Sequence, residues 1–529
     1  MNQDIVEIAR TIYSYGGFAY MRKKVVFSRL LLAMTMATSF MLTACSSNGN
    51  NEAASSSSPT TSAAAETNAK PVELKVAIPI FRTEPKDLRV VETELNKLLI
   101  DKINATISFV PISYGNWNQQ MNLMLSSQEP LDLTVVLNYS SLIAKGQLLD
   151  ITDLLTKYGS DITSTLGQDY VNAAKVDGKI YGVAGLHDMA SSAGVVLRKD
   201  IAEKNKIDLS SIKTLADLEP ALKTIKENEP GMAGISPGGV GFTFIDTMFP
   251  VDNLGDGFGV LPNYDNGLKV VNKYEMPEYA DMLKLLHKWY QEGYILKDAA
   301  TTQTTTGDLE RADKLFASTA KMKPDFDVQE SISTGKDMAS VELVQPVSTT
   351  EGVTGALWGV PYYSKNAEQA IKFLNLLFTD KEIVNLIDWG IEGTHYVKVP
   401  GQEDMIDYPE GVDASTSAYS HGLQFLMGNE FLSYVRKGQS PDLWKQTDEF
   451  NKSAIKSKAL GFTFNAEAVK AEITAVTNVT NQYKRTLETG TIDPEKYLPE
   501  FISKLKEAGI DKIIAEKQKQ LDAWVEGNK

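Results

Sequence analysis

The sequence predicts an α/β protein with two lobes and a helical C-terminal region. Its 529 residues exceed what one hydrophobic core accommodates, because single cores stop growing at roughly 250–300 residues. Strand-like and helix-like patterns alternate at the start of the folded part, which is the order of an α/β lobe with a parallel sheet. Apolar residues at helical spacing dominate the last third of the chain.

The first lobe begins with a period-two alternation at residues 72–78, which is typical of a strand with one buried face. The apolar run at residues 131–137 is typical of a strand that is buried on both faces in a parallel sheet. In chain order, the expected elements are a strand at 72–78, a helix at 87–103, a strand at 107–112, a helix at 117–125 and a strand at 131–137.

The next stretch predicts a second lobe of the same kind. Thr214 and Asp217 have the spacing of a capping box, and Leu218, Leu222 and Ile225 follow at helical spacing. The other elements expected here are strands at 194–198 and 234–236 and an amphipathic helix at 278–292.

Three helices are expected near the C-terminus. Asn465 can cap the first of them, whose apolar face continues to Leu487. Pro499 is expected at the first position of the second helix, which Gly509 ends. Asp511 is expected to cap the last helix.

The N-terminus has the layout of a secretory signal. Basic residues at 22–24 precede an apolar stretch, and small residues precede Cys45. Arg29 interrupts the apolar stretch, which leaves it short of the roughly 20 apolar residues that a membrane span needs. We therefore expect residues 1–44 to be a leader and signal peptide, with translation starting either at Met21 or at the first residue.

Cys45 is the only cysteine, so neither an intramolecular disulfide nor a thiolate metal cluster can form. The sequence Leu42-Thr43-Ala44-Cys45 resembles the lipobox of bacterial lipoproteins, in which the cysteine receives acyl chains such as palmitate and the chain is cut just before it. The resemblance implies a membrane anchor at Cys45. The alternative is a buried structural cysteine behind a plain signal peptide. Residues 45–70 lack the apolar content needed to fold and are expected to be a flexible tether.

Charge and motif content argue against several functions. The formal net charge is −15, whereas nucleic-acid binding needs a basic surface. The sequence contains no Gly-rich phosphate loop. Its four histidines are far apart and form no zinc-binding motif. We therefore expect no metal site, no cofactor and no nucleic-acid partner.

Three features together resemble the extracellular solute-binding proteins of ABC importers. The first is the lipobox with its polar tether. The second is VDGKIYGV at 176–183, followed by VVLRKD at 195–200. The third is ALWGVP at 356–361, followed by NAEQAIKFLNLL at 366–377. In maltose-binding-like receptors, such segments lie next to the crossings between two lobes.

DWGIEGTHY at 388–396 and the C-terminal part resemble a Gram-positive subgroup of large lipoproteins whose C-terminal region is uncharacterised. The resemblance implies a two-lobed periplasmic-binding-protein-like fold with a hinge between the lobes. It assigns residues 71–184 and 310–356 to the first lobe and residues 185–309 and 357–529 to the second. It also implies a monomeric, non-catalytic receptor on the outer face of the cell membrane. Such a receptor would deliver a carbohydrate, expected to be an oligosaccharide, to the permease subunits of an ABC importer.

A sugar site needs flat aromatic platforms and orienting polar groups, because a sugar has apolar C–H faces and a ring of hydroxyls. Ligand loops in α/β lobes follow the carboxyl ends of strands. The candidate ligand-binding residues are Trp117, Asn138, Tyr139, His187, Asp188, Trp358, Trp389 and Glu392. Among them, Trp117 and Trp358 are expected to be platforms, and Asp188 and Glu392 to accept hydroxyl hydrogen bonds.

Some of these residues also have an ordinary structural interpretation. Trp117, Tyr139 and Trp389 can equally be core aromatics, and His187 with Asp188 can form a solvated turn. Two other functions stay open at this point. One is a peptide-binding receptor, and the other is a secreted glycoside hydrolase, which needs two facing carboxylates.

Overall fold

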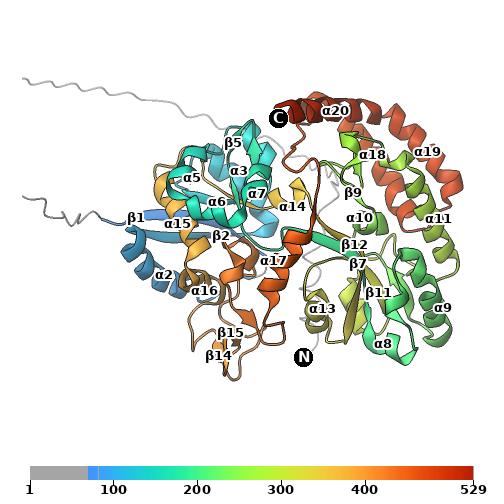
Figure 1. The fold of residues 1–529 in the computed structure, drawn as a ribbon, viewed down its shortest axis with the longest axis horizontal. Helices are drawn as coiled ribbons and strands as arrows, with labels where there is room; N and C mark the ends of the chain where they lie inside the picture. Colours follow the sequence, from blue (N-terminus) through green and yellow to red (C-terminus); the bar gives the residue numbers. More distant parts are fainter. Residues whose placement is uncertain (1–69, 82, 528–529) are drawn as a thin grey trace, which may run out of the picture. The chain divides into compact units, whose positions relative to one another are not determined.

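The structure, a computed structural model, describes residues 70–81 and 83–527. The expected leader and signal peptide, the lipidation site Cys45 and the tether up to residue 69 lie outside the described residues. The described chain is an α/β protein with two five-stranded mixed sheets. Its C-terminal region is helical, as Figure 1 shows. The α/β class and the helical C-terminal region expected from the sequence are confirmed.

The first sheet is built from the segments in which strand and helix patterns alternate. Its strand order is β2-β1-β3-β13-β6, with β1 parallel to β2 and β3, and with β13 antiparallel between β3 and β6. The strands are β1 (Val72–Ile80), β2 (Ala105–Ser113), β3 (Leu133–Val136), β6 (Val183–Ala184) and β13 (Leu357–Gly359). The helices of this lobe are α2 (Leu88–Ile103), α3 (Trp117–Ser127), α4 (Tyr139–Ala144), α5 (Thr152–Tyr158), α6 (Ser160–Leu166), α7 (Gln168–Ala173), α15 (Ala367–Thr379) and α16 (Lys381–Trp389).

The second sheet has the strand order β17-β12-β7-β11-β8. Its β7 pairs antiparallel with β11 and β12, and β11 pairs in parallel with β8. The strands are β7 (Ser191–Arg198), β8 (Ala233–Ser236), β11 (Leu315–Met322), β12 (Met338–Ser348) and β17 (Ile455–Lys456). The helices of this lobe are α8 (Lys199–Lys204), α9 (Glu219–Asn228), α10 (Phe244–Met248), α11 (Pro277–Gln291), α12 (Thr306–Arg311) and α13 (Phe326–Thr334).

The strand pairing differs from the lobe boundaries expected from the sequence. Residues 310–356 were expected in the first lobe, but β11 and β12 of this segment pair with β7 in the second sheet. Residues 357–529 were expected in the second lobe, but β13 lies between β3 and β6 in the first sheet. The chain returns to the second sheet at β17, which pairs with β12. Backbone hydrogen bonds decide which sheet a strand joins, and apolar patterning does not distinguish between two similar sheets.

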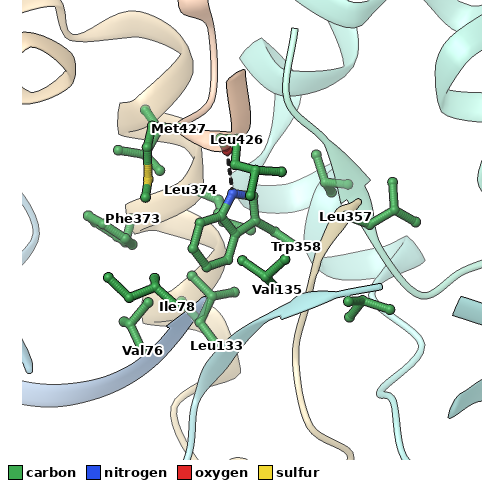
Figure 2. Close-up of a cluster of buried hydrophobic side chains, with 14 of the residues drawn as sticks. Val76, Ile78, Leu133, Val135, Leu357, Trp358, Phe373, Leu374, Leu426 and Met427 are labelled. Carbon is green, nitrogen blue, oxygen red and sulfur yellow. Dashed lines mark hydrogen bonds between the residues drawn. The ribbon is translucent and has the colours of Figure 1, made fainter. Parts of the chain in front are cut away.

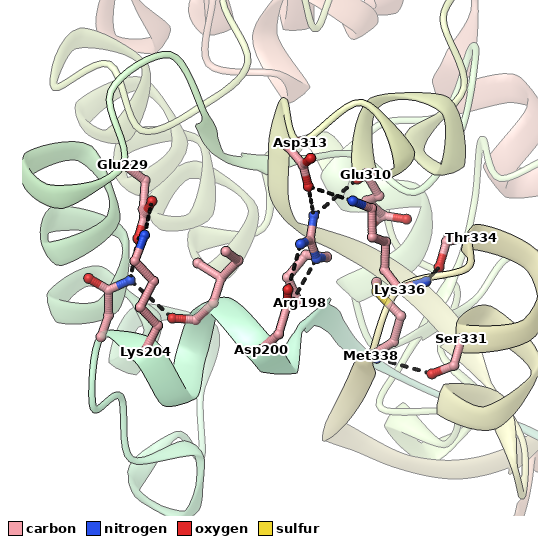
Figure 3. Close-up of polar contacts among 12 residues, drawn as sticks. Arg198, Asp200, Lys204, Glu229, Glu310, Asp313, Ser331, Thr334, Lys336 and Met338 are labelled. Atoms are coloured by element: carbon pink, nitrogen blue, oxygen red, sulfur yellow. Dashed lines mark hydrogen bonds and ion pairs between the residues drawn. The ribbon is translucent and has the colours of Figure 1, made fainter.

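The buried guanidinium of Arg198 lies at the carboxyl end of β7, and Figure 3 shows it between two carboxylates. The side chain of Arg198 is only 4% exposed, and its Nη1 and Nη2 each lie 2.6 Å from a carboxylate oxygen, of Asp313 and Asp200 respectively. Nη1 also donates to the backbone carbonyl of Glu310 at 3.1 Å. A buried charge needs such partners because it has lost its hydration.

The C-terminal helices are α18 (Lys470–Glu488), α19 (Pro494–Glu507) and α20 (Ile510–Gly527), and they pack with α11 around a common apolar core. The second of them begins before Pro499, which is the start expected from the sequence. It begins at Pro494 with Asp493 as its N-cap, whose side chain accepts a hydrogen bond from the Glu495 N–H. Asp-Pro supplies both the cap acceptor and the favoured first helical residue, which makes it the stronger start signal.

Smaller elements complete the described chain. They are β4 (Lys175–Val176), β5 (Lys179–Ile180), β9 (Val251–Asp252), β10 (Leu261–Pro262), α14 (Thr350–Thr354), β14 (Val397–Val399), β15 (Gln402–Asp407), β16 (Val435–Arg436) and α17 (Leu443–Ser453). Among the helices of residues 70–81 and 83–527, none is long and apolar enough to cross a membrane.

Candidate ligand-binding site

The carboxyl ends of four strands meet along one edge of the first sheet. Strands β1, β2 and β3 are parallel, and β6 has the same direction because it and β3 both pair antiparallel with β13. The strand order reverses at β1, since β2 lies on one side of it and β3 on the other. Ligands of open α/β sheets bind outside the carboxyl ends of the strands at such a reversal. This edge is therefore the first place to look for a site.

Two exposed aromatic rings lie at this edge. Phe81 directly follows β1 and Tyr114 directly follows β2, and their ring centroids are 4.7 Å apart with planes tilted by 39°. Phe81 is 37% exposed and Tyr114 is 53% exposed. Adjacent aromatic rings that remain in water offer an apolar surface to a ligand, because burying that surface is favourable. The pair has the character of a platform for the C–H face of a sugar.

The second sheet presents a third exposed aromatic in a corresponding position. Strand β8 is followed by the loop Pro237-Gly238-Gly239-Val240-Gly241-Phe242, in which Phe242 is 55% exposed. The loop lies tightly against β11, because a Cβ atom at Gly238 would be only 1.9 Å from the carbonyl oxygen of Thr319. Phe242 therefore extends from a loop that glycine allows to approach the sheet closely.

The two edges come together at the first crossing between the sheets. Asp188 lies beyond the end of β6, and Lys323 directly follows β11. The Lys323 ammonium lies 3.2 Å from Asp188 Oδ1, and Nδ1 of His187 lies 3.3 Å from the same oxygen. Burial would raise the pKa of Asp188, but the His187 hydrogen bond and the Lys323 charge outweigh it and hold the pKa below its ordinary value. An ionised carboxylate at this crossing can accept hydroxyl hydrogen bonds.

A polar cavity of about 270 Å³ lies beside the Gly-rich loop of the second sheet. This volume is just below the range of about 300–1,000 Å³ that is typical of small-molecule sites. Burial raises the pKa of Glu330 in its wall. The residues around the cavity are Val196, Gly238, Thr305, Thr306, Gly307, Arg311, Ser318, Thr319, Ala320, Phe326, Glu330 and Ser333.

A smaller cavity of about 90 Å³ lies at the carboxyl end of β3. Asn138 contributes to its wall and donates from Nδ2 to Asn118 Oδ1 at 2.7 Å. Trp117 is also part of the wall, but it is only 3% exposed. Among the predicted site residues, Asn138 thus lies beyond the carboxyl end of β3, and His187 and Asp188 lie beyond that of β6.

The other predicted platform, Trp358, lies in the core of the first lobe (Figure 2). It is 1% exposed, and its indole N–H donates to the carbonyl of Leu426 at 2.6 Å. Apolar side chains of β1, β3 and α15 surround its ring, among them Ile78, Val135 and Phe373. A ring packed on both faces has no surface to offer a sugar. The structure therefore favours the core interpretation for Trp358, as it does for Trp117.

The remaining predicted residues are Tyr139, Trp389 and Glu392. The hydroxyl of Tyr139 donates to the Ala174 carbonyl at 2.5 Å, which is a structural contact. Trp389 donates to Ser433 Oγ at 2.9 Å, and the guanidinium of Arg436 lies 4.6 Å from the centre of its ring. Glu392 is exposed in the turn after α16.

Sequence reasoning missed Phe81 and Phe242 and did not select Tyr114. The usable signal was their position, because each follows a strand that the apolar pattern indicates. Tryptophans were preferred as platforms because of their larger rings, although large aromatics are most often buried. Across residues 70–81 and 83–527, no group of three or more His, Cys, Asp or Glu side chains could hold a metal ion.

Comparison with known proteins identifies related families and relatives. Residues 96–411 match the family described as bacterial extracellular solute-binding protein, and residues 458–526 match a domain of unknown function (DUF3502). A relative from Streptococcus pneumoniae serotype 4 is named carbohydrate ABC transporter substrate-binding protein. It is 31% identical over 88% of this chain and 93% of its own length. Lipoprotein LipO of Bacillus subtilis is 24% identical over 61% of this chain and 67% of its own length.

Solved structures show the same fold. The crystal structure of the N-glycan transport solute binding protein (NgtS) from Streptococcus pneumoniae has a TM-score of 0.79 at 30% identity. The similarity covers 87% of this chain and 100% of that one. The complex of NgtS with Man5GlcNAc has a TM-score of 0.66 at 30% identity, over 87% of this chain and 99% of that one. The expected two-lobed solute-binding fold is confirmed by this likeness.

Proposed function

This chain belongs to the bacterial extracellular solute-binding protein family, and from that premise we propose that it captures an oligosaccharide and delivers it to an ABC importer. As a member of this family it is a transport receptor and not an enzyme. The observation that carries the sugar proposal is the position of Phe81, Tyr114 and Phe242, which are exposed at the carboxyl edges of both sheets.

In this proposal the three aromatic rings supply most of the affinity. Hydroxyl hydrogen bonds to protein replace those to water, so each contributes only about 0.5–1.5 kcal/mol. Burying the C–H face of a sugar on a ring adds roughly 25 cal/mol per Å² of apolar surface. Asn138, His187 and Asp188 then orient the hydroxyls. Trp117 and Trp358 support the site from the core and do not contact the ligand.

An oligosaccharide fits the spread of these groups better than a single sugar does. The aromatic rings extend over two sheets, and the cavity beside Gly238 adds room for a further unit. NgtS, at 30% identity, is solved in complex with Man5GlcNAc. We therefore propose mannose- and N-acetylglucosamine-containing glycans as the first class to test.

The test is a set of alanine substitutions at Phe81, Tyr114 and Phe242, with affinity measured by titration calorimetry. The ligand is Man5GlcNAc or the best glycan in a thermal-shift panel that also contains peptides. Loss of a true platform should weaken binding at least tenfold, or about 1.4 kcal/mol. Wild-type affinity in all three folded variants would exclude this site, and stabilisation by peptides alone would exclude the sugar class.

Tyr362 provides the matched control for these variants. It is 44% exposed, but it lies beyond the carboxyl end of β13, which runs opposite to β1, β2 and β3. This aromatic is therefore at the other edge of the first sheet. Tyr362→Ala should bind the glycan as the wild type does.

We also propose that acyl chains on Cys45 hold the receptor at the outer face of the cell membrane. The support is the lipobox-like Leu42-Thr43-Ala44-Cys45 and the distant similarity to lipoprotein LipO. Cys45→Ser should release the protein into the medium, measured by fractionation. A Ser variant that stays in the membrane fraction would contradict lipidation.

A further inference from the structure

One buried polar network joins the C-terminal helices to the loop that presents Phe242. Helix α10 begins directly after this loop, with Thr243 as its N-cap. Thr243 and Asp246 form a capping box, in which the Thr243 N–H donates to Asp246 Oδ2 at 3.1 Å and the Asp246 N–H donates to Thr243 Oγ1 at 3.2 Å. The orientation of this first turn sets where the backbone leaves toward Phe242.

Both members of the capping box are held from α18. Glu488 is 0% exposed, and its Oε2 lies 2.5 Å from the Thr243 hydroxyl. Its other oxygen accepts a hydrogen bond from the Tyr279 hydroxyl of α11 at 2.9 Å. One turn earlier in α18, the Lys484 ammonium lies 2.5 Å from Asp246 Oδ1.

Proton counting assigns the state of Glu488. The Thr243 hydroxyl lies 2.5 Å from Glu488 and also 2.9 Å from Asp246 Oδ2, yet it has only one proton to donate. A protonated Glu488 satisfies both contacts, because it donates to the hydroxyl while the hydroxyl donates to Asp246. Burial raises the pKa of Glu488 in agreement with this assignment, although the charges of Lys484, whose Nζ lies 3.9 Å from Glu488 Oε2, and of Lys273 oppose the shift. Hydrogen bonds then connect Tyr279, Glu488, Thr243, Asp246 and Lys484 in one continuous chain.

Beyond its close approach to β11 at Gly238, the loop has a backbone hydrogen bond of its own, from the Phe242 N–H to the Gly239 carbonyl at 3.2 Å. It contains three glycines among its six residues, and Gly241 has a left-handed φ of +86°. Glycine-rich backbone has much conformational freedom, which must be lost when a ligand binds. Fixing the loop at both ends reduces that loss before the ligand arrives. Strand β8 fixes one end, and the Thr243 network fixes the other.

We propose that the C-terminal helices, a domain without an assigned role, act as a brace that positions Phe242 for ligand binding. Glu488 and Lys484 are its positioning residues, and they act through Thr243 and Asp246. The ligand-binding consequence rests on the proposed function. The bracing itself does not, because it concerns the protein without ligand.

The first experiment measures amide hydrogen exchange in the ligand-free protein. In Glu488→Leu, the amides of residues 238–243 should exchange at least about tenfold faster, while those of residues 191–198 in β7 keep their wild-type rate. Glu488→Gln should preserve slow exchange, because an amide offers the same acceptor and donor as a neutral carboxyl group. Should Glu488→Leu fail to fold, Lys484→Met replaces it.

The control is Tyr483→Phe, in the same helix. Its hydroxyl donates to Glu500 at 2.6 Å and accepts from Lys504, and both partners belong to α19. Exchange in the loop should not change in this variant. Equal acceleration in Tyr483→Phe and Glu488→Leu, or no acceleration in either, would overturn the brace.

The second experiment is a double-mutant cycle on glycan affinity, with Man5GlcNAc as the probe. Glu488→Leu should weaken binding about fivefold, but it should add nothing in a Phe242→Ala background, because it acts through that ring. Additive losses would overturn the positioning role. Wild-type affinity in Phe242→Ala would remove Phe242 from the proposed site instead, and the exchange experiment would still decide the brace.

Discussion

The imidazole of His421 is 6% exposed, and backbone groups occupy both of its nitrogens. Nε2 lies 2.7 Å from the Ile387 carbonyl, and Nδ1 accepts from the Leu423 N–H at 2.9 Å. Because a carbonyl only accepts, Nε2 carries the proton and the ring is neutral. A second proton would remove the bond from Leu423. Burial lowers the pKa of His421 to about 4. The hydrogen bond to the Ile387 carbonyl favours the charged form but does not offset the burial.

This residue predicts an acid-dependent loss of stability. The folded pKa lies below the unfolded value of 6.5, so the unfolded chain binds the additional proton first. The contribution of His421 to the free energy of unfolding is therefore complete above pH 6.5 and is lost as the pH falls toward 4, by up to about 3 kcal/mol. Urea unfolding across this range should show a steeper decline in the wild type than in His421→Gln. Equal slopes would contradict the assignment.

Removing the positive charge of Arg198 should lower the free energy of unfolding far more than removing that of Lys204. The Arg198 side chain is 4% exposed, whereas Lys204, which pairs with Glu229 at 2.8 Å, is 62% exposed (Figure 3). Arg198→Met should lower the free energy of unfolding by about 2–3 kcal/mol, because it leaves the Glu310 carbonyl without its donor and removes packing. Lys204→Met should cost at most about 1 kcal/mol, because exposed ion pairs are weak. Similar losses in thermal or urea unfolding would contradict this difference.

At the scale of helices and strands, local patterns predicted much of the first lobe. The strands at the positions of β1, β2 and β3 and the helices between them were expected in the observed order. Each is marked by its own residues, through period-two or helical spacing. The sheet membership of β11, β12 and β13 was not predictable in the same way, because it depends on pairing between distant segments that leaves no local pattern.

The candidate site was only partly predictable for a related reason. Asn138, His187 and Asp188 were selected because they follow strands, which is a topological rule. Trp358 was selected for its ring, but its burial depends on α15 and on Leu426, which is 68 residues away in sequence. Exposure of Phe81 and Phe242 likewise depends on tertiary packing. Sequence therefore indicated the edge of the sheet better than it indicated the contacting side chains.

The start of α19 gives a prediction at the scale of one helix. Asp493 accepts from the Glu495 N–H at 2.9 Å, so Asp493→Ala should lower the free energy of unfolding by about 0.5–2 kcal/mol. Asp511 is the control, because it lies inside the first turn of α20 and not at its cap. Asp511→Ala should cost only about 0.3–1 kcal/mol through the helix dipole. A larger loss for Asp511→Ala in urea unfolding would contradict the observed helix start.

At the scale of the folded body, hydrogen bonds tie the crossings between the sheets to one another. The chain leaves the first sheet after Ala184 and returns to it at Leu357, having left the second sheet after Ser348. The hydroxyl of Ser348 donates to the Met189 carbonyl at 2.9 Å, which joins these two crossings. Asn451 of α17 accepts from the Met189 N–H at 2.8 Å and so adds a third segment. Any relative motion of the lobes must bend the backbone next to these bonds.

Glu430 lies at the same junction, where its N–H donates to the Leu186 carbonyl at 2.9 Å. Burial raises the pKa of Glu430 to about 7, although the nearby charges of Lys323 and His187 oppose the shift. The folded pKa thus exceeds the ordinary value of 4.5, and the folded protein binds the proton more tightly than the unfolded chain does. The contribution of Glu430 to stability is complete below pH 4.5 and is lost as the pH rises through 7.

Glu430→Gln should therefore stabilise the junction on the alkaline side only. An amide cannot ionise, so the free energy of unfolding at pH 8 should rise by about 1–2 kcal/mol relative to the wild type, a value below the full shift because Glu430 is only partly buried. At pH 4.5 the two proteins should be nearly equal. Glu392→Gln removes an exposed carboxylate from the turn after α16 and serves as the control for the substitution itself. Urea unfolding between pH 4.5 and 8 measures all three proteins. A plot of unfolding free energy against pH that is parallel for Glu430→Gln and the wild type would contradict the prediction, because this carboxyl group would then ionise in the folded protein as it does in the unfolded chain.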